Sequence, residues 1–145
     1  MKRLAVENAT RGAALGTRVG WADSFWLRLR GLLGRPRLRP GEGLLLTPCS
    51  SVHMHGMRYP LDVAVLGRDG VIVATYPALL PGGRTRWHRG ARHVLELPAG
   101  VLAATGTSVG DCVAWSPAPP DPDPSSSRPG AARTAAPEPL SGTRS

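Results

Sequence analysis

The chain reads Leu61-Asp62-Val63-Ala64-Val65-Leu66, then Gly67-Arg68-Asp69-Gly70, then Val71-Ile72-Val73-Ala74-Thr75-Tyr76. The two outer runs are apolar and rich in β-branched residues, which favour strands. The four residues between them are turn formers. The pattern predicts an antiparallel hairpin, the clearest local structure in the sequence.

Shorter signals on both sides of this hairpin also favour strands. Leu4 and Val6 alternate with polar or small residues, and a turn at residues 8–12 precedes a second extended stretch from Ala13 to Val19, so an N-terminal hairpin is expected. Further strands are expected at 44–46, at 93–97 and from 110 to 115, with a helical turn at 99–104. We therefore predict a mainly β domain of about eight short strands, arranged as a small sandwich or barrel.

One segment has the period of an amphipathic helix. Between residues 22 and 33, large apolar side chains recur at helical spacing, and Gly34 fits just past the C-terminus as a structural cap. We expect this helix to bury one face against the sheet. The apolar positions are Phe25, Trp26, Leu29, Leu32 and Leu33.

The C-terminal part of the sequence has a different composition. Residues 117–145 are rich in Pro, Ser and Ala, with Leu140 as the one large aliphatic side chain. Such a segment cannot bury enough apolar surface to offset the entropy of ordering it. We predict one folded domain at residues 1–116 and a disordered tail at 117–145.

The formal net charge is +8, but seventeen of the eighteen basic residues are arginines, a bias that base composition alone can produce. The charge is therefore weak support for an anionic partner. Glu7 and Asn8 interrupt the short apolar run after the basic start, and no apolar run has the length of a membrane span. The expectation is a cytoplasmic protein without membrane insertion.

Six blocks of sequence, in order and spacing, resemble the domain-of-unknown-function family 192. They are Gly31-Leu32-Leu33-Gly34-Arg35, Gly43-Leu44-Leu45, Pro60-Leu61-Asp62-Val63, Asp69-Gly70-Val71-Ile72, Val94-Leu95-Glu96-Leu97-Pro98-Ala99-Gly100 and Gly110-Asp111. The resemblance covers nearly all of residues 3–115. It implies a compact β-sandwich-like domain with one or two helices and no established activity.

One departure from that family contains most of a cluster of potential metal ligands. Where the family commonly has Trp-Met-Lys-Asn-Thr, this chain has His53-Met54-His55-Gly56-Met57. In an extended strand Cys49, His53, His55 and Met57 share one face, and thiolate, imidazole and thioether suit copper or zinc. The spacing Cys49-x-x-x-His53-x-x-x-Met57 is similar to that of a copper-ligand loop, but such a site needs a further histidine upstream, and none precedes His53. We therefore expect His53 and His55 to be partly exposed polar residues, without a metal or other cofactor.

Three acidic residues are candidates for a structural role. Asp62 lies between buried neighbours and is expected to be held by Arg35 or by backbone N–H groups; the alternative is a general base. Glu96 should accept hydrogen bonds, and alternation along its strand places His93 on the opposite face. Asp111 follows Gly110 and is expected to introduce the last strand.

Three functional hypotheses remain open from the sequence. The first is a non-catalytic binding or accessory module for a protein or small molecule, with a ligand groove near residues 49–62 and the 77–90 loop. Its candidate ligand-binding residues are Arg35, His53, His55, Met57, Trp87 and His88. The second is a hydrolase-type enzyme that uses Asp62 and a histidine.

The third hypothesis is a nucleic-acid-associated basic protein. Its candidate surface combines Trp21 and Trp26 with the arginines at positions 28, 30, 35, 37 and 39. However, Trp26 falls on the predicted core face of the helix, and no nucleic-acid-binding signature is present in the sequence. A nucleic acid is therefore the less favoured partner.

Overall fold

The computed structural model of the chain describes residues 2–22, 37–51 and 58–120. Within these ranges seven strands and one short helix are formed. The strands are β1 (Lys2–Asn8), β2 (Ala13–Ala22), β3 (Glu42–Leu46), β4 (Leu61–Gly67), β5 (Ile72–Leu79), β6 (Ala91–Pro98) and β7 (Val113–Pro117), and the helix is α2 (Val101–Thr105). All seven strands belong to one sheet, in the order β5-β4-β6-β3-β2-β1-β7.

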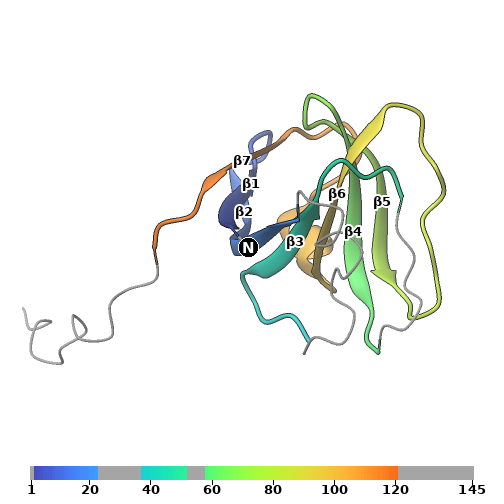
Figure 1. Ribbon diagram of the computed structural model, residues 1–145, viewed down its shortest axis with the longest axis horizontal. Coiled ribbons are helices and arrows are strands. Elements are labelled where there is room, and N and C mark those ends of the chain that lie inside the picture. The colour runs from blue at the N-terminus through green and yellow to red at the C-terminus, as the bar shows by residue number, and fades with distance from the viewer. Residues whose placement is uncertain (1, 23–36, 52–57, 121–145) are drawn as a thin grey trace, which may run out of the picture.

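The sheet curls strongly, so that β1, β2 and β7 stand across from β4 and β5 (Figure 1). Five of the six strand pairs are antiparallel, and β2 and β3 are the parallel pair. At one end the two edges of the sheet meet, where Val71 bridges to Cys112. The backbone N–H of Val113 donates to the carbonyl of Gly70 at 2.9 Å, and the backbone N–H of Ile72 donates to the carbonyl of Asp111 at 2.9 Å. The result is a half-barrel closed at one end.

Gly70 is required at this closing point. Its φ of +85° lies in the left-handed region that side chains disfavour. A Cβ atom at this position would lie 2.6 Å from the carbonyl oxygen of Val113. The turn can therefore approach β7 closely only because residue 70 is a glycine.

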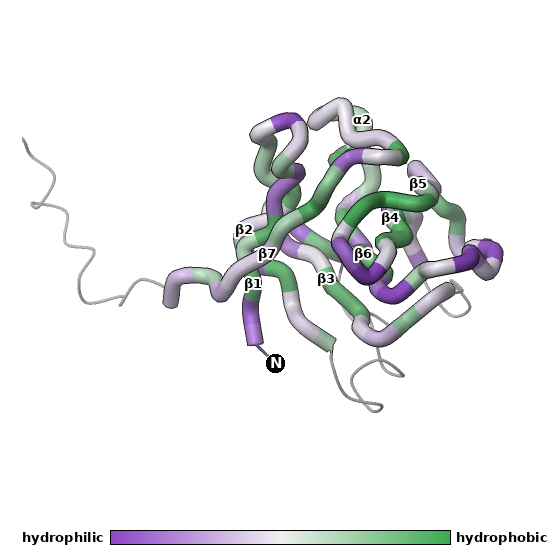
Figure 2. Tube along the Cα trace, turned by 90° about the horizontal axis from the view of Figure 1, so that it is seen from above, coloured by the Kyte–Doolittle hydropathy of each residue, from purple (hydrophilic) through white to green (hydrophobic). Residues whose placement is uncertain are grey.

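The curled sheet has an apolar cluster on each face. The inner cluster fills the curl and contains Leu102 of α2 together with Leu4, Val6, Leu15, Val19, Leu45, Ala64, Leu66, Ile72, Leu95, Leu97 and Val113. The outer cluster lies on the opposite face of the central strands and contains Ala22, Leu44, Leu46, Tyr59, Leu61, Val63 and Val94. All seven residues of β4 are buried because both of its faces are covered. In Figure 2 the trace near the β4 label is mostly hydrophobic, although the strand also contains Asp62.

The mainly β, barrel-like fold expected from the sequence is confirmed. Both predicted hairpins form, β1 with β2 and β4 with β5. β2 is longer than predicted and continues to Ala22, where the helix was expected to begin. The remainder of that predicted helix, residues 23–33, lies outside the described residues. The helical turn expected at 99–104 is α2, which begins two residues later and ends one residue later than expected.

Candidate functional site

Strand register brings a row of side chains together on the outer face of the sheet. Leu44 on β3 pairs with Glu96 on β6, Glu96 pairs with Val63 on β4, and Val63 pairs with Tyr76 on β5. Residues directly opposite one another on neighbouring strands point to the same face. The row therefore places the carboxyl group of Glu96 between the aliphatic side chains of Leu44 and Val63. The phenol of Tyr76 lies two strands away from Glu96.

Glu96 is the most unusual residue of this row. Its side chain is 7% exposed, and its Oε2 atom is buried with no hydrogen-bond partner among the described residues. Burial raises the pKa of the Glu96 carboxyl to about 7, because the charged form loses its hydration. A hydrogen-bonded Glu96 was expected from the sequence, and no described residue donates to this oxygen. Glu96 is thus a buried acid whose protonation state changes near neutral pH.

Tyr76, at the end of the row, anchors the loop that follows β5. The Tyr76 hydroxyl lies 2.6 Å from Nε2 of His88 and accepts the backbone N–H of Arg86 at 3.1 Å. Between these two contacts, the Trp87 side chain is 70% exposed. The loop is therefore held at residues 86 and 88 and presents the indole ring between them to solvent.

A hollow lies on the same face of the sheet. Its volume is about 140 Å³, and its walls include Arg37, Leu38, Tyr59 and Ala99. Its lining also contains Leu61 and Pro98, which lie opposite each other on β4 and β6. Two residues further along these strands, Val63 and Glu96 lie opposite each other. The Glu96 side chain is not part of the lining of this hollow.

Asp62 points to the inner side and is fully engaged by backbone groups. Its Oδ1 accepts the N–H of Ala78 at 2.8 Å, and its Oδ2 accepts those of Gly100 at 3.0 Å and Leu102 at 2.8 Å. The carboxylate thus joins β5 and the first turn of α2 to β4. Arg35, the side-chain partner considered from the sequence, lies outside the described residues.

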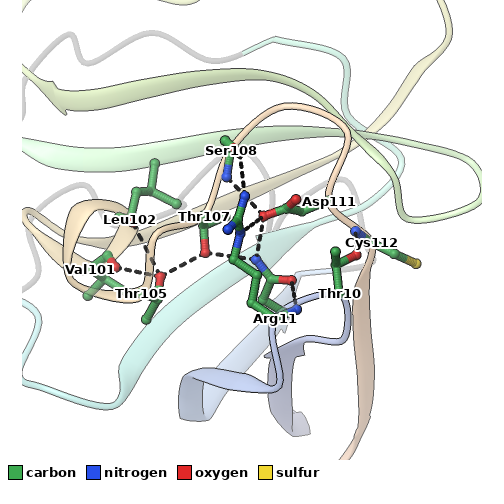
Figure 3. Close-up of polar contacts among 10 residues, drawn as sticks. Thr10, Arg11, Val101, Leu102, Thr105, Thr107, Ser108, Asp111 and Cys112 are labelled. Carbon is green, nitrogen blue, oxygen red and sulfur yellow. Dashed lines mark hydrogen bonds and ion pairs between the residues drawn. The ribbon is translucent and has the colours of Figure 1, made fainter.

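Asp111 is the centre of a polar network between the first hairpin and the loop before β7 (Figure 3). Its Oδ2 accepts hydrogen bonds from Arg11 Nε at 2.6 Å, Asn8 Nδ2 at 2.9 Å and Ser108 N–H at 3.1 Å. Asn8 also donates to Thr107 at 2.9 Å. The hydrogen bonds from Arg11, Asn8 and Ser108 lower the pKa of Asp111 to about 2, since each favours the ionised form.

The other candidate residues are separated from this face or are not described. His53, His55 and Met57, like Gly34, lie outside the described residues; in the part of the chain that is described, no three His, Cys, Asp or Glu side chains cluster as metal ligands. Cys49 donates to the carbonyl of Ser51 at 3.2 Å. His93 contacts Thr47 at 2.7 Å, and burial lowers its pKa. His93 pairs with Leu66 of the inner cluster and therefore lies on the face opposite Glu96. The alternation of residues along the strand predicted this placement.

Comparison with protein-family models matches residues 6–115 to DUF192, described as "Uncharacterized ACR". The chain belongs to the DUF192 family. A UPF0127 protein of Thermococcus sibiricus is 30% identical over an alignment of 120 residues, which covers 74% of this chain and 72% of that protein. A UPF0127 protein of Pyrococcus furiosus is 32% identical over an alignment of 111 residues, which covers 74% of this chain and 95% of the relative.

Two solved structures share the fold of this DUF192 chain. A protein of unknown function from Novosphingobium aromaticivorans superposes with a TM-score of 0.67 at 23% identity, covering 78% of this chain and 84% of its own. A protein titled a putative transcription regulator from Sinorhizobium meliloti superposes with a TM-score of 0.66 at 26% identity, covering 79% and 92%. In the described part of this DUF192 chain, no helix is long and apolar enough to cross a bilayer.

Sequence reasoning missed two residues of this face in the DUF192 chain. Neither Tyr76 nor Tyr59 was predicted as a site residue, because a tyrosine at the start or end of an apolar run is common in protein cores. Alternation alone would place Tyr76 on the same face as Ile72 of the inner cluster, and the irregular register between Ile72 and Ala74 turns Tyr76 to the outer face. Nothing in the local sequence around Tyr59 indicates that it lines a hollow.

Proposed function

We propose that this chain is a non-catalytic binding module that recognises a protein partner through the loop at residues 77–90. The observation that carries the proposal is Trp87, whose ring is 70% exposed on a loop fixed at both neighbouring residues. Tryptophan is among the side chains that contribute most at protein interfaces, since it buries a large area at low entropic cost. An ordered loop reduces that cost further.

Several contacts fix the backbone of the loop and leave the side chains of Leu80 and Trp87 exposed to solvent. Thr85 is buried, Gly83 N–H donates to Leu80 O at 2.8 Å, and Ala91 N–H donates to His88 O at 3.1 Å. Leu80, at the start of the loop, is 66% exposed. An exposed leucine and tryptophan on one anchored loop favour a partner that offers apolar pockets.

The charge of the loop indicates the chemistry of the partner. Arg84, Arg86 and Arg89 are exposed, and residues 77–90 contain no Asp or Glu. A surface of this sign is complementary to an acidic one. We therefore propose an acidic protein surface, with an apolar pocket for Trp87, as the partner.

The hydrolase alternative is less well supported by the geometry of the described residues. Both oxygens of Asp62 accept backbone hydrogen bonds, so a base at this position would have to release its donors. His88 is engaged by Tyr76, and His93 contacts Thr47 on the inner side. The hydrolase alternative would need these groups to converge on a shared substrate position.

The experiment is quantitative co-purification from the native cell extract with the full chain as bait. We expect an acidic protein to be captured by the wild type and reduced at least fivefold with Trp87→Ala. Val109→Ala is the matched control, because Val109 is 58% exposed on a different loop, and it should leave capture unchanged.

Direct binding then distinguishes the partner classes. The purified candidate protein should bind the wild type and lose affinity with Trp87→Ala. Equal capture by the wild type and by Trp87→Ala would overturn the proposal. A labelled single-stranded oligonucleotide that binds through Trp87 while no protein does would also overturn it, in favour of a nucleic-acid role.

A further inference from the structure

The hollow on the outer face of the sheet has a charged side chain in its lining, that of Arg37. The guanidinium carbon of Arg37 lies 5.7 Å from the centre of the Tyr59 ring, which lines the same hollow. Within residues 2–22, 37–51 and 58–120, no carboxylate forms an ion pair with Arg37, and no group accepts a hydrogen bond from its side chain. The guanidinium is therefore positioned by an aromatic ring, and its N–H donors are available to a ligand.

The other walls of the hollow are apolar and ordered. Tyr59 and Leu61 are buried members of the outer cluster, and Leu38 packs against that cluster. Pro60 and Pro98 add two further walls, and a proline ring has a fixed backbone angle and little side-chain freedom. A ligand therefore meets an apolar surface that is formed before it binds, which lowers the entropic cost of binding.

We propose that this hollow binds a small monocarboxylate with a compact apolar body. The body lies against Tyr59, Leu61 and Pro98, and the carboxylate accepts two parallel hydrogen bonds from the Arg37 guanidinium at the mouth. The contact of the guanidinium with the Tyr59 ring uses no N–H donor, so the two interactions are compatible. The site uses none of residues 77–90, so it goes beyond the proposed function, and neither proposal depends on the other.

The size of the hollow limits the apolar body. A cavity of about 150 Å³ is known to accept benzene. The hollow measures about 140 Å³, so it accommodates a body of about six carbon atoms. Arg37 is exposed and therefore lies at the solvent side of the lining, where the carboxylate of such a ligand remains partly hydrated. This arrangement avoids the free-energy cost of burying the charge of the ligand completely.

The charge of the neighbouring residues in the sequence also favours an anion. Two further exposed arginines, Arg39 and Arg58, lie close in sequence to residues of the lining, although neither lines the hollow. Glu42, the described acidic residue nearest in sequence to Arg37, accepts the backbone N–H of Arg39 at 2.7 Å and is also outside the lining. The single guanidinium of the lining balances one negative charge, which favours a carboxylate over a phosphate group with a charge of about −2.

The test separates the charged head from the apolar body with three compounds. Benzoate has both, benzamide has the same ring with a neutral head, and acetate has the carboxylate without the ring. Each is titrated into the isotope-labelled full-length protein at low ionic strength and a pH of about 7, where both carboxylates are ionised. We expect benzoate to bind at least about fivefold more tightly than benzamide and about tenfold more tightly than acetate, because only benzoate makes both interactions. The backbone N–H signals of Leu61 and Ala99 in the lining should shift as benzoate binds.

Four variants show which residues are responsible. Arg37→Gln should reduce the affinity for benzoate to that for benzamide and leave benzamide binding unchanged, because it removes the charged partner of the head. Arg39→Gln is the matched control, since Arg39 is exposed two positions away and is outside the lining, and it should change neither affinity. Ala99→Leu narrows the hollow and should weaken benzoate and benzamide alike. Trp87→Ala, the variant that tests the proposed function, should change neither affinity.

Several outcomes would overturn the proposal. They are benzamide or acetate binding as tightly as benzoate, benzoate affinity unchanged in Arg37→Gln, and no saturable shift of the Leu61 and Ala99 signals with benzoate at millimolar concentrations. Loss of benzoate binding in Trp87→Ala would also overturn it, because the compound would then bind at the 77–90 loop. None of these outcomes affects the capture of a protein partner through Trp87, so the two proposals can fail separately.

Discussion

The carboxylate of Asp62 accepts the N–H of Leu102 at 2.8 Å, across forty positions of sequence. Leu102 belongs to the first turn of α2, where backbone N–H groups have no partner within the helix. The helix has no side-chain cap of its own at Gly100. Asp62 on β4 therefore provides the hydrogen-bond acceptor that a capping residue next to the helix normally provides.

We predict that Asp62→Ala destabilises the protein by about 1–3 kcal/mol, because it orphans the donors at residues 78, 100 and 102, of which Leu102 is the most buried. Asp62→Asn retains one acceptor oxygen and should recover part of the loss. Denaturant unfolding of the three proteins at neutral pH measures the difference. If both variants are as stable as the wild type, Asp62 is not a structural carboxylate and the hydrolase hypothesis gains support.

Gly70→Ala should be more destabilising than Gly82→Ala, although both glycines have a φ of +85°. The backbone penalty of about 1 kcal/mol is common to both. A Cβ at Gly70 meets the Val113 carbonyl at 2.6 Å, whereas one at Gly82 meets nothing within 4 Å. We expect an additional loss of about 1–3 kcal/mol at Gly70, measured by thermal or denaturant unfolding. Equal losses at the two sites would contradict the close approach of the β4–β5 turn to β7.

Stability should fall as pH rises from about 5 to 7, owing to Glu96. Its pKa is about 7 in the folded protein and lower in the unfolded chain, so the folded state holds the extra proton in this range. The slope reaches at most about 1.4 kcal/mol per pH unit and disappears above pH of about 7. Glu96→Gln should abolish the slope, while Glu7→Gln at an exposed position should preserve it. A wild-type profile that is flat between pH 5 and 7 would refute the prediction.

Asp111 should have the opposite dependence on pH. Its pKa is lowered to about 2 by Arg11, Asn8 and Ser108, so the unfolded state binds a proton before the folded state does as pH falls. The stability that it contributes is complete above pH of about 4 and is lost as the pH approaches 2. Asp111→Asn should be less stable than the wild type at pH 5, and the two should converge near pH 2 in urea unfolding. A constant gap between them would show that the charge of Asp111 is not involved.

Removal of residues 121–145 should leave the unfolding midpoint within about 2 °C of the full chain, because a tail rich in Pro, Ser and Ala buries little apolar surface. The cut follows Ala118, whose N–H donates to Arg3 O at 3.0 Å, so this contact is kept. Differential scanning calorimetry compares the two chains. A drop of more than about 5 °C, or roughly 1 kcal/mol, would show that the tail packs.

The sequence by itself determined the local elements and the character of the fold. The β4–β5 hairpin followed from two apolar runs around Gly67 and Gly70, and the β1–β2 hairpin from alternation around a polar turn. The placement of His93 and Glu96 on opposite faces followed from the two-residue period of a strand. These features depend on interactions between residues close in sequence, so a local pattern is sufficient to predict them.

Only the tertiary structure decided which distant residues meet. The end of β2 was predicted too early, at Val19, because its last residues pair with β3, a parallel partner twenty-four positions away. The same holds for Glu96, whose isolation depends on Leu44 and Val63 from two other strands, and for the three donors that surround Asp62. Strand order and register are set by burial summed over the whole sheet, and no short stretch of sequence contains that information.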